Sequence, residues 1–126
     1  MSSLAEERCT PSRPEERIAD AELGAWAARV PLWSLERGGA EPRLSRRFRF
    51  ADFALALAFA NRIGAIADAE NHHPELTVEW GRVQVRWWTH VCRGLHRNDF
   101  VMAAKTDRLA AETQEPRREP PKKTPR

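Results

Sequence analysis

The apolar side chains of this 126-residue chain change their spacing along the sequence, and this change limits the possible folds more than any other feature. In RLSRRFRF (43–50), LTVEW (76–80) and VQVRWW (83–88), alternate side chains are apolar apart from Arg46, which is typical of strands with one mainly buried face. In ADFALALAFANRIGAIADAE (51–70), the apolar side chains recur at helical spacing instead. The pattern therefore predicts a sheet that is covered by helices.

Three further segments complete the predicted order of elements. PEERIADAELGAWAARV (14–30) and DFVMAAKTDRLAAE (99–112) have helical spacing, and LWSLE (32–36) is a short strand candidate. The order is therefore α-β-β-α-β-β-α. We expect an α+β fold in which a four-stranded antiparallel sheet carries its helices on one face.

The long central helix has a broad apolar face that we expect to lie on the sheet. Two adjacent stripes make up this face: Leu55, Phe59, Ile63 and Ile66 form one, and Phe53, Leu57, Ala60, Gly64 and Ala67 form the other.

The last two strands are predicted to form a tight hairpin. Gly81 and Arg82 suit a two-residue turn, which would place Leu76 roughly opposite Trp87. Before the hairpin, Asn71 can end the central helix, and Pro74 favours an extended backbone at the preceding residue. Residues 72 and 73 should therefore lie where a helix hands over to a strand.

The formal net charge of +3 comes entirely from the C-terminal end of the chain. Residues 113–126 hold five basic and two acidic side chains, whereas residues 1–112 hold 16 of each. We therefore predict one domain at 15–112, between a flexible N-terminal arm (1–14) and a disordered, basic, Pro-rich tail (113–126). A folded domain without net charge argues against nucleic-acid binding.

The cysteine content and the apolar runs indicate a cytoplasmic protein. Cys9 and Cys92 are the two cysteines, which is too few for a disulfide framework. The first residues have no apolar leader, and no apolar run is long enough to cross a membrane. We expect no membrane association, and we expect Cys92 to be a packed thiol.

Three of the four histidines are predicted to meet at one edge of the sheet. His72 and His73 leave the central helix, the hairpin brings His90 back to their level, and Asp68 lies one helical turn before His72. Imidazole side chains can donate and accept protons near neutral pH. A proton-transfer pocket is therefore the preferred interpretation, whereas His96 is expected to be exposed near the last helix.

Two other interpretations of these histidines stay open. Three histidines and a carboxylate resemble a zinc ligand set, but adjacent histidines seldom point the same way, and no HxH or HExxH spacing is present. The histidines could also be polar loop residues without a joint role. We predict no metal site.

The segment DAENHHPELTVEWGRVQVRWWTHVCRGLHRND (68–99) resembles the signature of the pterin-4a-carbinolamine dehydratases, and the resemblance extends over about residues 15–112. The signature has an acidic or polar residue, His-His-Pro after three residues, an aromatic residue, a further histidine and an aspartate. The matching residues are Asp68, His72, His73, Pro74, Trp80, His90 and Asp99.

The resemblance implies a hydro-lyase that removes water from 4a-hydroxytetrahydropterin during tetrahydrobiopterin recycling. It implies no metal or redox cofactor, because the pterin is the substrate. His73 and His90 are expected to transfer protons, and His72 to bind the pterin or assist. Asp68 is expected to orient a histidine or hold a pterin N–H. The resemblance thus implies catalytic roles for Asp68, His72, His73 and His90. It implies pterin contacts at Asn71, His72, His73, Trp88, Thr89 and His90. Structural roles are expected for Pro74, Trp80 and Asp99.

The resemblance also implies partners and an alternative function. Members form homodimers or homotetramers, and an aromatic amino-acid hydroxylase supplies their substrate. Some relatives are instead non-catalytic binding modules that act as a transcription coactivator or a carboxylase assembly factor. The presence of all three histidines favours catalysis here.

Overall fold

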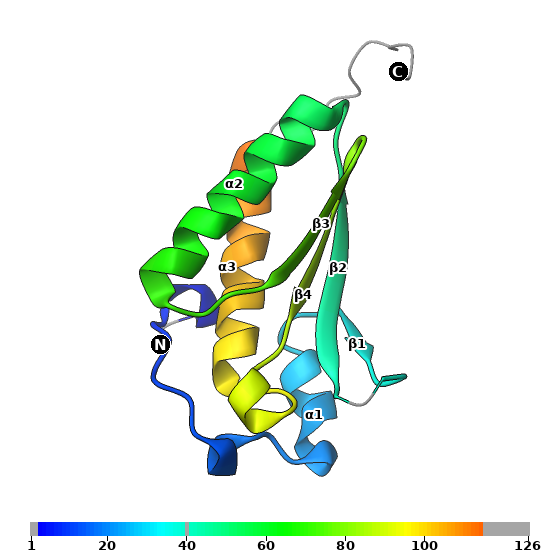
Figure 1. Ribbon diagram of the computed structural model, residues 1–126. Helices are drawn as coiled ribbons and strands as arrows, with labels where there is room; N and C mark the ends of the chain where they lie inside the picture. Colours follow the sequence, from blue (N-terminus) through cyan, green and yellow to red (C-terminus); the bar gives the residue numbers. More distant parts are fainter. Residues whose placement is uncertain (1–2, 40, 115–126) are drawn as a thin grey trace.

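The computed structural model describes residues 3–39 and 41–114, and they form an α+β fold around one four-stranded sheet (Figure 1). All strand pairs are antiparallel, and the strand order is β1-β2-β4-β3. The fold class and the order of elements agree with the sequence prediction. The strands are β1 (Ser34–Glu36), β2 (Arg43–Arg49), β3 (Glu75–Glu79) and β4 (Arg82–Trp87).

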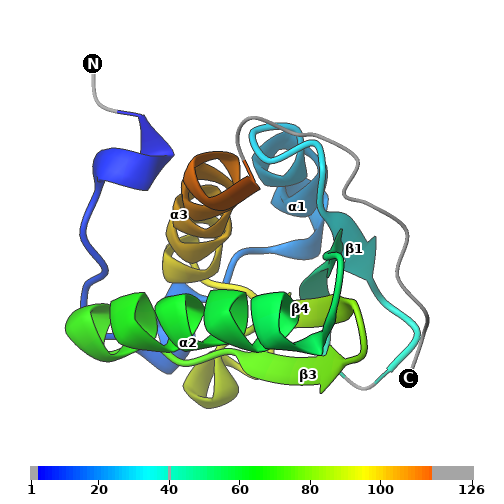
Figure 2. The same cartoon turned by 90° about the horizontal axis from the view of Figure 1, so that it is seen from above.

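Two long helices cover one face of the sheet, as Figure 2 shows from above. They are α2 (Phe53–Glu70) and α3 (Arg97–Gln114), and the shorter α1 (Asp20–Ala27) packs against the beginning of α3 through Trp26 and Phe100, whose ring centroids lie 5.2 Å apart. Three 3₁₀ turns complete the structure: η1 (Leu4–Glu6), η2 (Pro14–Glu16) and η3 (His90–Cys92). None of these described helices is both long and apolar enough to cross a membrane.

The first helix is shorter than its sequence pattern predicts. The backbones of Arg17 and Ala19 are not helical, with ψ angles of 135° and 147°. Between them, the N–H of Ile18 donates to the carbonyl of Leu95 at 2.8 Å, and the Ile18 side chain is buried. A contact with a distant part of the chain therefore interrupts the helical pattern before Asp20.

The hairpin turn lies one residue earlier than predicted. Because Glu79 pairs with Arg82, the two turn residues are Trp80 and Gly81, and Leu76 lies opposite Val85 rather than Trp87. Gly81 has a φ of +72°, which glycine adopts without strain. A Cβ atom there would lie 3.0 Å from the Phe50 carbonyl oxygen, so both the angle and the space require glycine.

The central helix buries a narrower face than predicted. Its buried stripe consists of Ala56, Phe59, Ala60, Ile63 and Ala67. Leu55 and Leu57 each lie about 100° of helix rotation from Ala56, on either side of this stripe, and they are 50% and 42% exposed. Phe53, which begins the helix, is 45% exposed. The expectation that these three side chains lie on the sheet is therefore wrong for this chain.

Both ends of α2 are capped, and the second cap determines how the chain enters the site. The Asp52 carboxylate accepts the N–H of Leu55 at 2.9 Å. Asn71 adopts a left-handed conformation (φ 55°), and the N–H of His72 returns to the carbonyl of Ala67 at 3.1 Å. Asn71 therefore ends the helix, as the sequence predicts.

The N-terminal segment passes beside α3 and the C-terminal end of α2 (Figures 1 and 2). Leu4 is buried, and the Lys105 ammonium donates to the carbonyl of Ala5 at 2.9 Å. Residues 3–14, where the sequence indicated a loose arm, thus pack against the domain. Thr113 and Gln114 belong to α3, and the remainder of the predicted tail (115–126) lies outside the described residues.

Candidate active site

A cleft of about 520 Å³ lies where the end of α2, the start of β3 and the segment after β4 meet. This volume is in the range of small-molecule sites. The six residues that the sequence predicts as pterin contacts all line the cleft: Asn71, His72, His73, Trp88, Thr89 and His90. Pro74 lines it too, together with three residues that the sequence analysis missed, Ser12, Glu75 and Val91.

His72 is buried and fixed by a carboxylate. Its Nε2 lies 2.6 Å from Oδ1 of Asp99, which is fully buried. The other carboxylate oxygen accepts the Thr89 hydroxyl at 2.7 Å and the N–H of His96 at 2.9 Å. Since an ionised carboxylate can only accept, Nε2 carries a proton, and Nδ1 of the neutral ring is an acceptor. The indole of Trp87 stacks on the imidazole of His72, with 5.9 Å between the ring centroids and 11° between the ring planes.

Asp99 therefore does more than brace the last helix. Its carboxylate caps the first turn of α3 through the N–H of His96, and it also sets the tautomer of His72. Thr89 also bonds to Asp99, because its hydroxyl donates to the carboxylate, and its N–H donates to the Gly94 carbonyl at 2.8 Å. Both donors of Thr89 are thus used inside the protein.

His73 and Asp68 form a pair at the surface of the cleft. Nε2 of His73 lies 2.9 Å from Oδ1 of Asp68, and the two side chains are 57% and 82% exposed. Asp68 thus contacts His73 and not His72. Because water competes for both groups, this pair can open more easily than the buried one.

His90 has a third kind of environment. It begins η3 and is exposed, and its ring meets Trp88 edge to face at 5.1 Å. The Arg43 guanidinium lies 3.9 Å from the centroid of Trp88, which holds the indole in place. No hydrogen bond from another residue of the described chain holds the His90 imidazole, so it can meet a ligand or water.

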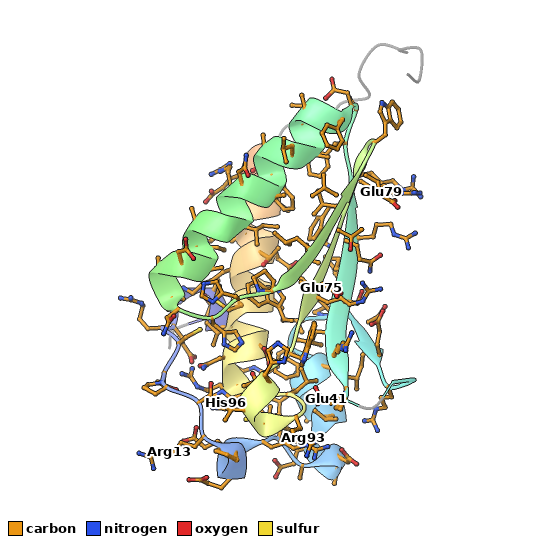
Figure 3. The ribbon with its side chains drawn as sticks, in the orientation of Figure 1. Arg13, Glu41, Glu75, Glu79, Arg93 and His96 are labelled. Atoms are coloured by element: carbon orange, nitrogen blue, oxygen red, sulfur yellow. The ribbon has the colours of Figure 1, made fainter. Side chains whose placement is uncertain are left out.

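His96 is buried, and the expectation that it is exposed is wrong. Its Nδ1 accepts the N–H of Asn98 at 2.9 Å, and its Nε2 lies 2.9 Å from Glu16. The hydrogen bond from His96 lowers the pKa of Glu16. His96 therefore joins the base of α3 to the N-terminal segment that carries Arg13, and it does not line the cleft (Figure 3).

The remaining predicted residues have structural positions. Cys92 is buried, as expected, and desolvation raises the pKa of its thiol. Trp80 is half-buried in the hairpin turn, outside the core cluster. Glu79, beside that turn, points away from the helices (Figure 3). In the described part of the chain, no three His, Cys, Asp or Glu side chains gather as a metal ligand set.

The chain resembles one family over most of its length. A sequence model described as pterin 4 alpha carbinolamine dehydratase matches residues 16–109. A protein of Gloeobacter violaceus, named "Putative pterin-4-alpha-carbinolamine dehydratase 1", is 51% identical over 111 residues, which are 87% of this chain and 96% of that protein. A similarly named protein of Syntrophotalea carbinolica is 46% identical over 110 residues, 86% of this chain and 98% of that protein.

Two solved structures have a similar fold. A crystal structure described as a transcriptional coactivator/pterin dehydratase from Brucella melitensis has a TM-score of 0.68 and 29% identity, covering 75% of this chain and 98% of that one. A pterin dehydratase-like protein described as a RuBisCO assembly factor of the alpha-carboxysome has a TM-score of 0.51 and 24% identity, covering 61% and 89%. At that identity, the second structure supports the fold alone.

Proposed function

The chain belongs to the pterin 4 alpha carbinolamine dehydratase family, and on this premise we propose that it removes water from 4a-hydroxytetrahydropterin. The observation that carries the proposal is the cleft in which His72, His73 and His90 occur in three different environments. The product is the quinonoid dihydropterin, and no metal or redox cofactor is needed. The proposal places the reaction in the cytoplasm, where an aromatic amino-acid hydroxylase supplies the substrate.

The reaction requires two proton movements and leaves the protein unchanged overall. The bond between C4a and the hydroxyl oxygen breaks, the oxygen gains a proton, and N5 loses one as the C4a–N5 double bond forms. A protonated imidazole therefore acts as the acid at the hydroxyl, and a neutral imidazole acts as the base at N5. Exchange of protons with water restores both rings.

We assign the two proton transfers to His73 and His90, because both rings are exposed at the cleft. Asp68 orients His73 through its hydrogen bond. His72, which Asp99 fixes with Nε2 protonated, presents Nδ1 as the acceptor for a pterin N–H. Asn71 and Trp88 form further walls of the pterin site.

The test is the rate at which the 4a-carbinolamine disappears during a pterin-dependent hydroxylase reaction, followed by ultraviolet absorbance. The wild type should accelerate the loss, and His73→Ala and His90→Ala should each remove most of the acceleration. His96→Asn is the matched control, because it removes a histidine outside the cleft and keeps an acceptor for the Asn98 N–H. A folded wild type that does no better than buffer would refute the dehydratase proposal.

A binding function is the second candidate, and the exposed apolar side chains of α2 favour it. Phe53, Leu55 and Leu57 lie near one another in sequence and are 42–50% exposed. The Brucella structure carries both a coactivator and a dehydratase description, so the two roles are compatible on one fold.

We further propose that this chain forms a homodimer or homotetramer. A pull-down of partners by the wild type and by a Leu57→Glu variant would separate a binding role from the catalytic one.

A further inference from the structure

The N-terminal strap, which we define as residues 7–13, is held by hydrogen bonds at three points, Glu70, Asn98 and Cys92. The first point is Glu70, the last residue of α2. Its carboxylate accepts the N–H of Cys9 at 2.9 Å and Nε of Arg8 at 2.8 Å. Desolvation opposes ionisation of Glu70, but these donors outweigh it, and the pKa of Glu70 is lowered. Glu70 directly precedes Asn71, which lines the cleft.

The second point is Asn98, which is 1% exposed. Its side-chain oxygen accepts the N–H of Thr10 at 3.0 Å, and its side-chain nitrogen donates to the Thr10 carbonyl at 2.6 Å. Asn98 directly precedes Asp99, the residue that fixes His72. A buried amide with both polar atoms bonded to the strap backbone holds this part of the strap in one place.

The third point is Cys92, whose thiol donates to the carbonyl of Arg13 at 3.2 Å. Cys92 follows His90 and Val91, which both line the cleft. The strap therefore contacts Glu70 and Cys92, which are sequence neighbours of cleft residues, and Asn98, which precedes the residue that fixes His72. This arrangement fixes the position of the strap relative to the histidines.

Between the second and third points, the strap contributes Ser12 to the wall of the cleft. The other nine lining residues come from 71–75 and 88–91. The Ser12 oxygen accepts Nδ2 of Asn98 at 3.2 Å, which leaves its own O–H free to donate. Thr89 is the other hydroxyl of the described lining, and its proton is already given to Asp99.

We infer that Ser12 is a substrate-binding residue whose hydroxyl donates a hydrogen bond to an acceptor atom of the pterin. This inference rests on the proposed function. A pterin has a carbonyl oxygen and ring nitrogens that accept hydrogen bonds, and the cleft histidines are assigned to its N–H and hydroxyl groups. Ser12 supplies the hydroxyl donor that Thr89 does not. The strap is thus a wall of the active site, although it lies far from the histidines in sequence.

The test compares Ser12→Ala with Thr10→Ala in steady-state dehydration kinetics. Thr10 is the matched control, because its side chain is exposed and it holds Asn98 through backbone groups alone. Loss of one hydrogen bond to the substrate corresponds to a change of about 3- to 10-fold. We expect Ser12→Ala to raise KM by that factor with kcat unchanged, and Thr10→Ala to resemble the wild type. Titration with 7,8-dihydrobiopterin, followed by fluorescence, should show the same weakening of Kd in Ser12→Ala.

The other outcomes each overturn the inference, and they are distinguishable. Equal KM and Kd for wild type and Ser12→Ala would reject Ser12 as a pterin contact while leaving the dehydratase proposal intact. A lower unfolding temperature and a lower kcat at unchanged KM would mean that Ser12 merely holds the strap. A wild type that neither binds the probe nor accelerates dehydration would reject the proposed function, and the inference with it.

Discussion

The imidazole of His72 lies 2.6 Å from the carboxylate of Asp99, and both side chains are buried although one borders an open cleft. The two residues are 27 positions apart, and the hairpin of β3 and β4 lies between them. The fold therefore has to form before the tautomer of His72 is set. This arrangement makes Asp99 a positioning residue for the cleft, and its removal should affect both stability and chemistry.

Asp99→Asn should reduce kcat for carbinolamine dehydration by about 10- to 100-fold, because the amide no longer holds His72 with Nε2 protonated. It should also reduce the free energy of unfolding by about 2 kcal/mol, since the Thr89 hydroxyl and the His96 N–H lose a charged acceptor. Initial rates and urea unfolding curves measure the two effects. An unchanged kcat in a destabilised but folded variant would show that Asp99 has a structural role alone.

Asp68→Asn provides the contrast to Asp99→Asn, because its pair with His73 is exposed. The midpoint of urea unfolding should stay at the wild-type value, since exposed ion pairs contribute little to stability. The rate of dehydration should still fall, by no more than about 10-fold, because His73 loses the group that orients it. A fall as large as that of His73→Ala would indicate that Asp68 contacts the substrate itself.

Residue spacing predicted the helices and strands of the α+β fold well, because each of these elements has a local pattern of apolar side chains. Alternation located three of the four strands to within about two residues, and the left-handed Asn71 ended α2 as expected. The pattern overestimated the buried face of α2, because apolar character alone does not show that the flanking side chains of Leu55 and Leu57 lie outside the buried stripe. It also overextended the first helix, where Ile18 bonds to distant Leu95.

The cleft was predictable in its histidines and in Asp68, which was expected to orient a histidine and bonds to His73, but not in the other partners. His72, His73 and His90 were found from their spacing around a hairpin. The bonds of His72 to Asp99 and of His96 to Glu16 join residues far apart in sequence, so no local pattern could assign them. Ser12 was missed for the same reason, because a polar N-terminal segment with prolines gives no signal of where it packs.

The strap should lose its ionised anchor at Glu70 in acid, because Glu70 holds Cys9 and Arg8 as a carboxylate. The pKa of Glu70 is lowered from 4.5 in the folded protein, so its contribution to stability is complete above that value. The contribution is lost as the pH falls through the lower folded-state pKa. Melting temperatures of wild type and Glu70→Gln should therefore differ by a constant amount above about pH 5.5 and converge below pH 4.5.

Glu41→Gln is the control for this pH series, since the Glu41 carboxylate makes no hydrogen bond or ion pair within the described ranges. Its melting temperature should follow the wild type at every pH. A gap between wild type and Glu70→Gln that persists at pH 3 would contradict the assignment of Glu70 as an ionised anchor. In that case, the strap would be held by the Asn98 contacts and by the packing of Leu4, just before the strap, instead.

The wild type should be an oligomer, because two of its surfaces are unfavourable in water. β3 lies at the edge of the sheet, where its outer side pairs with no described strand, and α2 exposes Phe53, Leu55 and Leu57. Size-exclusion chromatography with light scattering should give a mass of two or four chains. Leu57→Glu should reduce that mass if α2 forms an interface, because the charge would be buried at the contact.

Ala65→Glu separates a specific interface from a general effect of charge. Ala65 is exposed on the same helix, on the side opposite the buried stripe, so the variant adds an equal charge away from the three apolar side chains. It should keep the wild-type mass. If Leu57→Glu and Ala65→Glu both keep it, then the Leu57 side of α2 is not an interface between copies, and the edges of the sheet are the next surfaces to test. If the wild type itself runs as one chain at micromolar concentration, the homo-oligomer proposal is wrong, and the exposed side chains of α2 remain available to a different partner.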